Sequence, residues 1–198
     1  MWVAPARGYA AEPLVAGTPG TGPSSASIVL VPADGNARGI RLRTHNVATT
    51  LIEDASGAWA DTDLRMELYN PGQSAVVLTL GLPGPQAELA AMPDIMSASA
   101  GPNALVLTPL AAPDRPDVQA TGVVTIPVKA SVDIAVRYRQ PLASRDSLAG
   151  YTYMLMGGNV WAGAPESTRI VITFAQHVSP ERIMHLAPAP HSMRPDEF

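Results

Sequence analysis

The sequence predicts an all-β fold, an antiparallel β-sandwich of about 8 to 10 strands flanked by irregular N-terminal and C-terminal arms. Three observations predict it. Apolar and polar residues alternate over short runs, the runs are rich in β-branched residues, and Gly, Pro, Asn or Asp bounds each run. A chain of 198 residues is long enough for one such domain with tails.

Residues 1–25 are predicted to form an extended arm. Proline and glycine recur through this stretch without any regular period. Proline fixes φ and removes a backbone donor, while glycine raises the entropic cost of ordering, so neither a helix nor a strand is expected. The apolar side chains of Trp2, Tyr9 and Leu14 are candidate anchors for a protein partner.

The sandwich domain is predicted to span residues 26–176. In "GIRLRTH" the period of two places Ile40 and Leu42 on one face, and Arg41, Arg43 and His45 on the other. The same alternation in later runs predicts a core made of Leu42, Leu64, Met66, Leu68, Val124, Ile134, Val136, Tyr153, Leu155, Ile170 and Ile172. One long segment, residues 84–103, lacks this alternation and is predicted to be a loop with room for a single helical turn.

Residues 177–198 are predicted to form a C-terminal arm. A short helix could begin there, with Ser179 as the N-cap and Pro180 in the first helical position. The apolar anchors of this arm are Ile183, Met184, Leu186 and Phe198. We expect the two arms to contact a protein partner or a second copy of the chain.

Composition excludes several classes of function. The chain carries 13 Lys and Arg against 17 Asp and Glu, so no basic surface for nucleic acid is expected. It contains no cysteine, which excludes disulfides and thiolate metal sites. No apolar run is long enough to predict a transmembrane segment, and the first residues lack the pattern of an intact signal peptide.

Titratable residues do not cluster into a recognisable catalytic motif. The four histidines lack the spacing of a helical zinc site, and neither a nucleophile elbow nor a phosphate loop is present. We therefore expect no enzymatic activity, no catalytic residues and no organic cofactor. A hydrolase whose site is assembled from distant residues is a third alternative.

The best group of oxygen ligands is "EDASGAWADTD". Asp61 and Asp63 alternate onto one strand face, and Asp54 precedes them across a loop, so these three carboxylates are candidate calcium ligands. The spacing matches no EF-hand. The alternative is a hairpin whose carboxylates are solvated or pair with arginines of the R-x-R runs, Arg41/Arg43 and Arg137/Arg139. The same arginines could instead form an anion-binding stripe.

The run "YTYMLMGGNVWAG" is apolar on both faces if it is a strand. This pattern favours a central hairpin with Trp161 at one end of the core. The alternative is a carbohydrate-binding platform formed by the indole rings of Trp59 and Trp161. A glycan- or calcium-binding module is therefore the second hypothesis for function.

The order of motifs resembles a family of uncharacterised bacterial extracytoplasmic β-sandwich domains. An N-P-x turn begins at Asn70, a later strand ends in Leu82-Pro83, and a Y-x-Y-x-L-x-x-G-x-x-W-x-G hairpin covers residues 151–163. The resemblance implies an exported sandwich without established catalytic residues. The first hypothesis is accordingly a non-enzymatic extracytoplasmic domain that acts through protein contacts, as a cell-surface or filament component or an accessory subunit.

Overall fold

The computed structural model describes residues 31–32, 37, 39–54, 57–83, 93–109, 118–145, 148–150 and 161–175. This part of the chain forms strands and no helix, which confirms the all-β prediction. In chain order the strands are β1 (Val31–Pro32), β2 (Arg41–Asp54), β3 (Gly57–Tyr69), β4 (Val76–Pro83), β5 (Asp94–Ala100), β6 (Asn103–Ala104), β7 (Leu107–Pro109), β8 (Val118–Ile126), β9 (Ser131–Pro141), β10 (Ala143–Arg145), β11 (Leu148–Gly150) and β12 (Ser167–Phe174).

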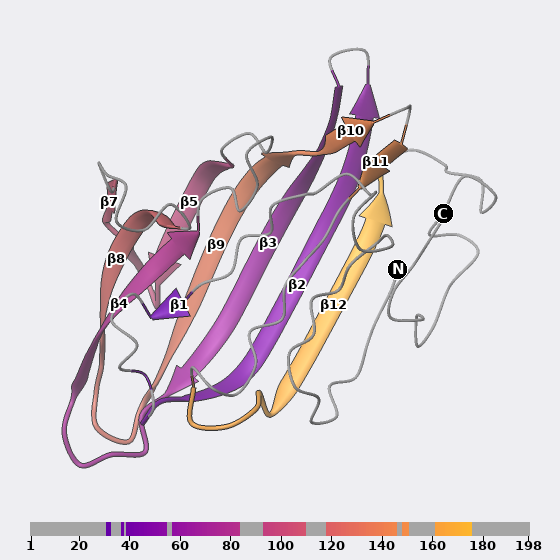
Figure 1. Cartoon of the computed structure of the whole chain (residues 1–198). Helices are drawn as coiled ribbons and strands as arrows, with labels where there is room; N and C mark the ends of the chain where they lie inside the picture. Colours follow the sequence, from indigo (N-terminus) through magenta and orange to yellow (C-terminus); the bar gives the residue numbers. More distant parts are fainter. Residues whose placement is uncertain are drawn as a thin grey trace.

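The larger layer is a six-stranded sheet with the order β12-β2-β3-β9-β5-β6. Its long strands lie side by side in Figure 1, with β12 at one edge. All of its neighbouring strands are antiparallel except β12, which pairs with β2 in the parallel direction. The fold is therefore antiparallel with one parallel pair.

The second layer is a four-stranded sheet with the order β1-β4-β8-β7. It lies toward the β5 and β9 side of the larger sheet in Figure 1. The chain crosses from the larger sheet to this one after β6, and the crossing places Leu105 in the core. A Cβ atom on Gly122 of β8 would lie 2.8 Å from the Leu105 side chain. Glycine at this position therefore leaves room for the Leu105 side chain, which any larger residue would force to shift.

The core lies between the two sheets and draws on both. Leu64, Ile134 and Val136 come from the larger sheet, and Leu78 and Val124 come from the smaller one. The members of the predicted core that are buried as expected are Leu42, Leu64, Met66, Leu68, Val124, Ile134, Val136 and Ile170. Ile172 is partly buried and packs against the same core, and the predicted burial of Trp161 is confirmed.

His45 corrects the predicted face of β2. Sequence alternation placed His45 with Arg41 and Arg43 on the polar face, but its side chain is buried at 2% exposure. The register shifts between Leu42 and Thr44, so Arg43 is an extra residue opposite β3. One inserted residue moves every later side chain to the opposite face, because the side-chain period of a strand is two.

The prediction that residues 84–103 form a loop is wrong for its second half. β5 covers Asp94–Ala100 and pairs with β9. A register shift between Ile95 and Ser97 interrupts the alternation there, and five of the seven residues are Ser, Ala or Asp. These residues have low β-propensity, so the run did not carry the signal of a strand.

Several sequence predictions lie outside the described residues. They are the two arms with their anchors, the C-terminal helix, and the core positions Tyr153 and Leu155. The domain limits of residues 26–176 also stay a prediction. In the part that the structure describes, no helix is long and apolar enough to cross a membrane.

Candidate functional site

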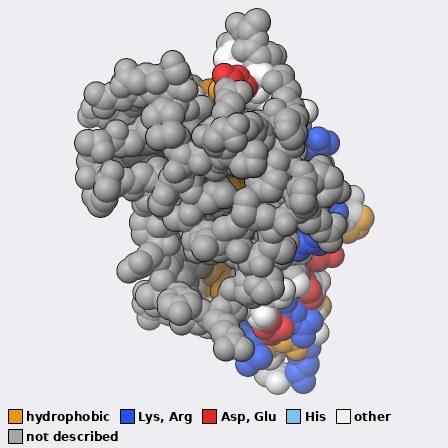
Figure 2. All heavy atoms as spheres, turned by 90° about the vertical axis from the view of Figure 1, so that its right-hand side faces the viewer, with side chains coloured by type: hydrophobic (Ala, Val, Ile, Leu, Met, Phe, Trp, Pro, Cys, Tyr) orange, Lys and Arg blue, Asp and Glu red, His pale blue; other side chains and the backbone are white. Residues whose placement is uncertain are grey.

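The outward face of the six-stranded sheet carries most of the charge that the sequence analysis selected. We call it the charged face and define it by Arg43, Asp61, Asp63, Arg65, Glu67, Arg137 and Arg139. Figure 2 shows basic and acidic side chains next to one another where the surface is coloured. The two signs are interspersed, so this face does not form a stripe of one charge.

Asp61 and Arg139 form the closest ion pair of the charged face. They are register partners on β3 and β9, and the guanidinium donates two hydrogen bonds to the carboxylate, at 2.6 and 2.7 Å. The hydrogen bonds from Arg139 hold the pKa of Asp61 below its ordinary value, although partial burial acts in the opposite direction. The cross-strand arginine partner predicted for Asp61 is confirmed.

The carboxylate of Asp63 binds an arginine of its own strand rather than one of a neighbouring strand. Arg65, two residues along the same strand, donates two hydrogen bonds of 3.1 Å to its carboxylate. Residues two apart on a strand share a face, which makes this contact available without any partner strand. Arg137 is the register partner of Asp63 on β9, but the ion pair forms with Arg65.

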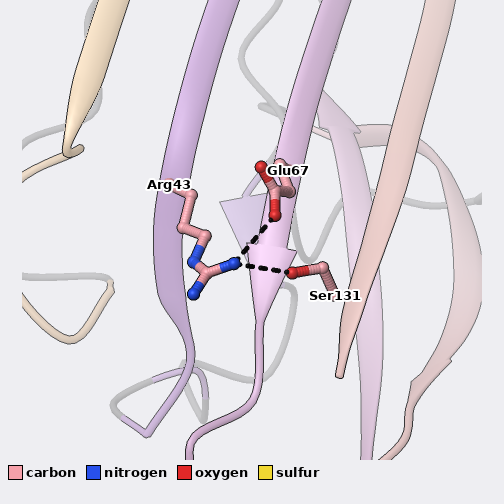
Figure 3. Close-up of polar contacts among 3 residues, drawn as sticks. All are labelled: Arg43, Glu67 and Ser131. Carbon is pink, nitrogen blue, oxygen red and sulfur yellow. Dashed lines mark hydrogen bonds and ion pairs between the residues drawn. The ribbon is translucent and has the colours of Figure 1, made fainter. Parts of the chain in front are cut away.

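Arg43 uses its position as the bulge residue to reach three groups. Its Nη1 donates to Glu67 Oε1 at 3.2 Å and to Ser131 Oγ at 3.3 Å, as Figure 3 shows. Its guanidinium carbon lies 4.1 Å from the centroid of the Tyr69 ring. Hydrogen bonding from Ser131, and then from Arg43, lowers the pKa of Glu67. These contacts join β2, β3 and the start of β9.

The candidate calcium ligands do not form a cluster in the described part of the chain. Asp61 and Asp63 each give both carboxylate oxygens to an arginine, and no group of three acidic or histidine side chains suited to a metal is found there. The side chain of Asp54 lies outside the described residues. A calcium ion would have to displace two guanidinium groups, so this geometry favours the structural interpretation.

The candidate carbohydrate platform is also not assembled. Trp161 is 2% exposed and belongs to the core, so its ring offers no face to a sugar. Trp59 is half-buried, and the guanidinium of Arg139 lies 5.3 Å from its ring centroid. Both indoles therefore act in packing.

The inward face contains polar side chains that sequence reasoning placed elsewhere or did not select. Burial lowers the pKa of His45 from 6.5 to about 4, because the charged imidazolium loses its hydration. The hydroxyl groups of Thr49 and Thr62, which face each other on β2 and β3, form a buried hydrogen bond of 3.0 Å. These groups belong to the interior and do not face solvent.

A second outward surface was missed by the sequence analysis. It covers the four-stranded sheet, and we call it the uncharged face, defined by Val77, Thr79, Thr108, Thr121, Val123 and Thr125. Val77 and Val123 are 61% and 62% exposed, respectively. The signal was present in "VVLTL" and "TGVVTI", whose outward positions alternate Val with Thr and contain no charge.

Comparison with known proteins supports the fold. No protein-family model matches the chain, and no curated protein matches it. A crystal structure of a "putative nutrient binding protein" from Legionella pneumophila matches with a TM-score of 0.51 and 13% identity. The match covers 74% of this chain and 55% of that one, so the chain corresponds to about half of the longer protein.

Two structures of an M1 zinc metallopeptidase from Deinococcus radiodurans match more weakly. Both have a TM-score of 0.38, with 13% and 14% identity. The matches cover 69% of this chain but only 31% and 32% of the peptidase. At these identities the likeness to solved structures concerns the fold alone.

Proposed function

We propose that this protein is a non-enzymatic extracytoplasmic β-sandwich domain that acts through protein contacts, as a surface component or an accessory subunit of a larger assembly. The observation that carries the proposal is the uncharged face. Isolated exposed valines are ordinary on protein surfaces, but a sheet face without any charged side chain is unusual for a solvated sheet. Such a face is expected where a second protein surface covers it.

Within the described part of the chain, the state of the titratable side chains supports a role without catalysis. A general base needs a pKa near the working pH and access to substrate, whereas His45 is buried and has a pKa of about 4. The carboxylates of Asp61 and Asp63 each accept two hydrogen bonds from an arginine, so a substrate or an ion would have to compete with these contacts. The extracytoplasmic location rests on the motif resemblance.

The arms complete the proposal. Proline-rich segments that are already extended lose less entropy when they dock, and each arm carries apolar anchors. We propose that at least one arm contacts another copy or another subunit. The residues concerned are Trp2, Tyr9, Leu14, Ile183, Met184, Leu186 and Phe198.

Deletion of residues 1–25 tests the contribution of the N-terminal arm. The truncated chain should keep its β-sheet circular dichroism and its melting transition, while sedimentation velocity should show weaker association than for the full chain. The matched control deletes residues 189–198, which removes only Phe198 among the anchors. Unchanged association of both truncated chains would show that the contacts lie elsewhere.

A further inference from the structure

We propose that the uncharged face binds the uncharged face of a second copy, so that two sandwiches form a symmetric dimer through their four-stranded sheets. This inference rests on the proposed function and names the surface and the partner. It is independent of the arms, because it uses only side chains on β4, β7 and β8.

The composition of the uncharged face is that of a buried sheet face. Val77 and Val123 are diagonal neighbours, because Val77 faces Thr125 and Val123 faces Thr79 across β4 and β8. Valine and threonine have few rotamers in a strand, so covering them costs little side-chain entropy. Sheets with such faces pack against one another about 10 Å apart in a sandwich.

The threonines do not prevent burial. Within the sandwich, Thr49 and Thr62 already satisfy each other by a buried hydroxyl hydrogen bond of 3.0 Å. A similar hydroxyl pair of 3.1 Å joins Thr50 to Thr173. Threonines of two apposed uncharged faces can pair in the same way, so their hydroxyl groups need not be left without partners.

Charge favours a second copy as the occupant. The chain has a net charge of −4, and two copies repel each other unless the surfaces that meet carry little charge. A contact through the charged face would desolvate ion pairs such as Asp61–Arg139 and gain little. Among the described surfaces, the uncharged face is therefore the one through which two copies can meet with the least charge repulsion. Lys129 lies in the turn after β8, beyond its last residue, and so is not part of this face.

The size of the face predicts a weak dimer. β4 and β8 have 8 and 9 residues, whereas β1 and β7 have only 2 and 3. With about 3.3 Å per residue and about 4.8 Å between strands, the face covers roughly 350 Å², so two copies would bury about 700 Å² in total. This area is below that of stable specific interfaces, so we expect a transient dimer that forms only as the concentration rises.

Sedimentation equilibrium of the full chain and two substituted chains tests the inference. Val123→Glu places a charge at the centre of the uncharged face and should raise the dimer dissociation constant at least about tenfold, because the charge would be buried without a partner. Asn46→Glu is the matched control. It adds the same charge to an exposed strand position between the register partners Arg65 and Arg169, and should leave the constant unchanged.

Circular dichroism and melting curves establish that each substituted chain is folded. If Val123→Glu does not fold, Thr125→Glu at the adjacent outward position replaces it. A full chain that is monomeric at all concentrations would overturn the inference. Unchanged association of the folded Val123→Glu chain, or of Thr125→Glu in its place, would also overturn it, but would leave the proposed function intact with its contact on the arms or elsewhere.

Discussion

The two outward faces of this sandwich expose different kinds of side chain to solvent. The charged face gives its carboxylates local partners, so that Asp61, Asp63 and Glu67 each bind an arginine. The uncharged face offers Val and Thr side chains with no charge among them, and Val77 and Val123 remain more than half exposed. A surface whose polar groups bind one another needs no partner. Exposed apolar side chains such as these valines, in contrast, are stabilised when another surface covers them.

Selection of candidate residues by their chemistry led to the charged face. Carboxylates and arginines attract attention in a sequence because they can bind metals, anions and substrates. In this fold they bind one another, and the surface that we propose for a partner consists of residues without distinctive chemistry. Substitutions of buried residues and then of outward residues test the difference between the faces.

The largest expected effect separates the inward from the outward side of one strand. Leu68→Ala should lower the free energy of unfolding by about 2 to 5 kcal/mol, because Leu68 is fully buried and its removal leaves a cavity. Glu67→Ala, the adjacent outward residue, should cost less than about 1 kcal/mol. Urea unfolding of both variants measures the difference. Similar losses at the two positions would mean that the faces of β3 are assigned incorrectly.

A smaller effect comes from the histidine that the bulge turns inward. Its folded pKa of about 4 lies below the unfolded value near 6.5, so the unfolded chain binds the proton first. His45 therefore costs no stability above pH 6.5, and its contribution falls as the pH drops, reaching a loss of about 3 kcal/mol at pH 4.

Urea unfolding of the wild-type protein and of His45→Gln at pH 7 and pH 4 isolates this contribution. The carboxylates of the charged face titrate in both proteins and cancel in the comparison. The variant should lose less stability between the two pH values. Equal losses in the two proteins would show that His45 is not buried in its neutral form.

The ion pairs of the charged face should contribute little. Arg139→Ala removes the Asp61 pair and the contact with Trp59, yet we expect a loss of less than about 1 kcal/mol, since both charged groups are partly solvated. The loss should shrink at high salt, because screening weakens the pair. Arg137→Ala, which removes an arginine without an ion pair in the described part of the chain, is the control in melting experiments at two salt concentrations. A loss of several kcal/mol that salt does not reduce would contradict this view.

The smallest expected effect is none at all. If arginines bind the carboxylates of Asp61 and Asp63 and no calcium does, adding a chelator or calcium should leave the melting temperature unchanged. A bound cation would instead stabilise the fold by about 2.7 kcal/mol at a hundredfold excess over its dissociation constant. A calcium-dependent rise in melting temperature that is absent from Asp61→Asn would show that the ion displaces the guanidinium groups.

Much of the fold could be predicted from alternation, and its exceptions have local physical causes. Leu64, Met66 and Leu68 are buried as the period of two requires. The faces predicted from alternation are wrong after the bulge at Arg43, because one extra residue reverses them. The residue types around a bulge do not reveal this extra residue. It failed again at β5, where small residues and a second register shift hide the strand.

The site was less predictable than the fold. The pairing of Asp61 with an arginine could be expected from strand chemistry. The choice of Arg139 depends on register, which is set by the whole sheet. The uncharged face could have been found by looking at which outward positions lack charge, but only after β4 and β8 had been recognised as neighbours.

The central claim is that the two faces differ in their need for a partner, and thiol labelling measures this directly. Because the chain contains no cysteine, Thr125→Cys and Ala48→Cys each introduce a single reactive group, one on each face. We predict that raising the protein concentration slows labelling of Thr125→Cys and leaves the labelling rate of Ala48→Cys unchanged. Labelling rates that are independent of concentration at both positions, or that fall equally at both, would contradict the claim.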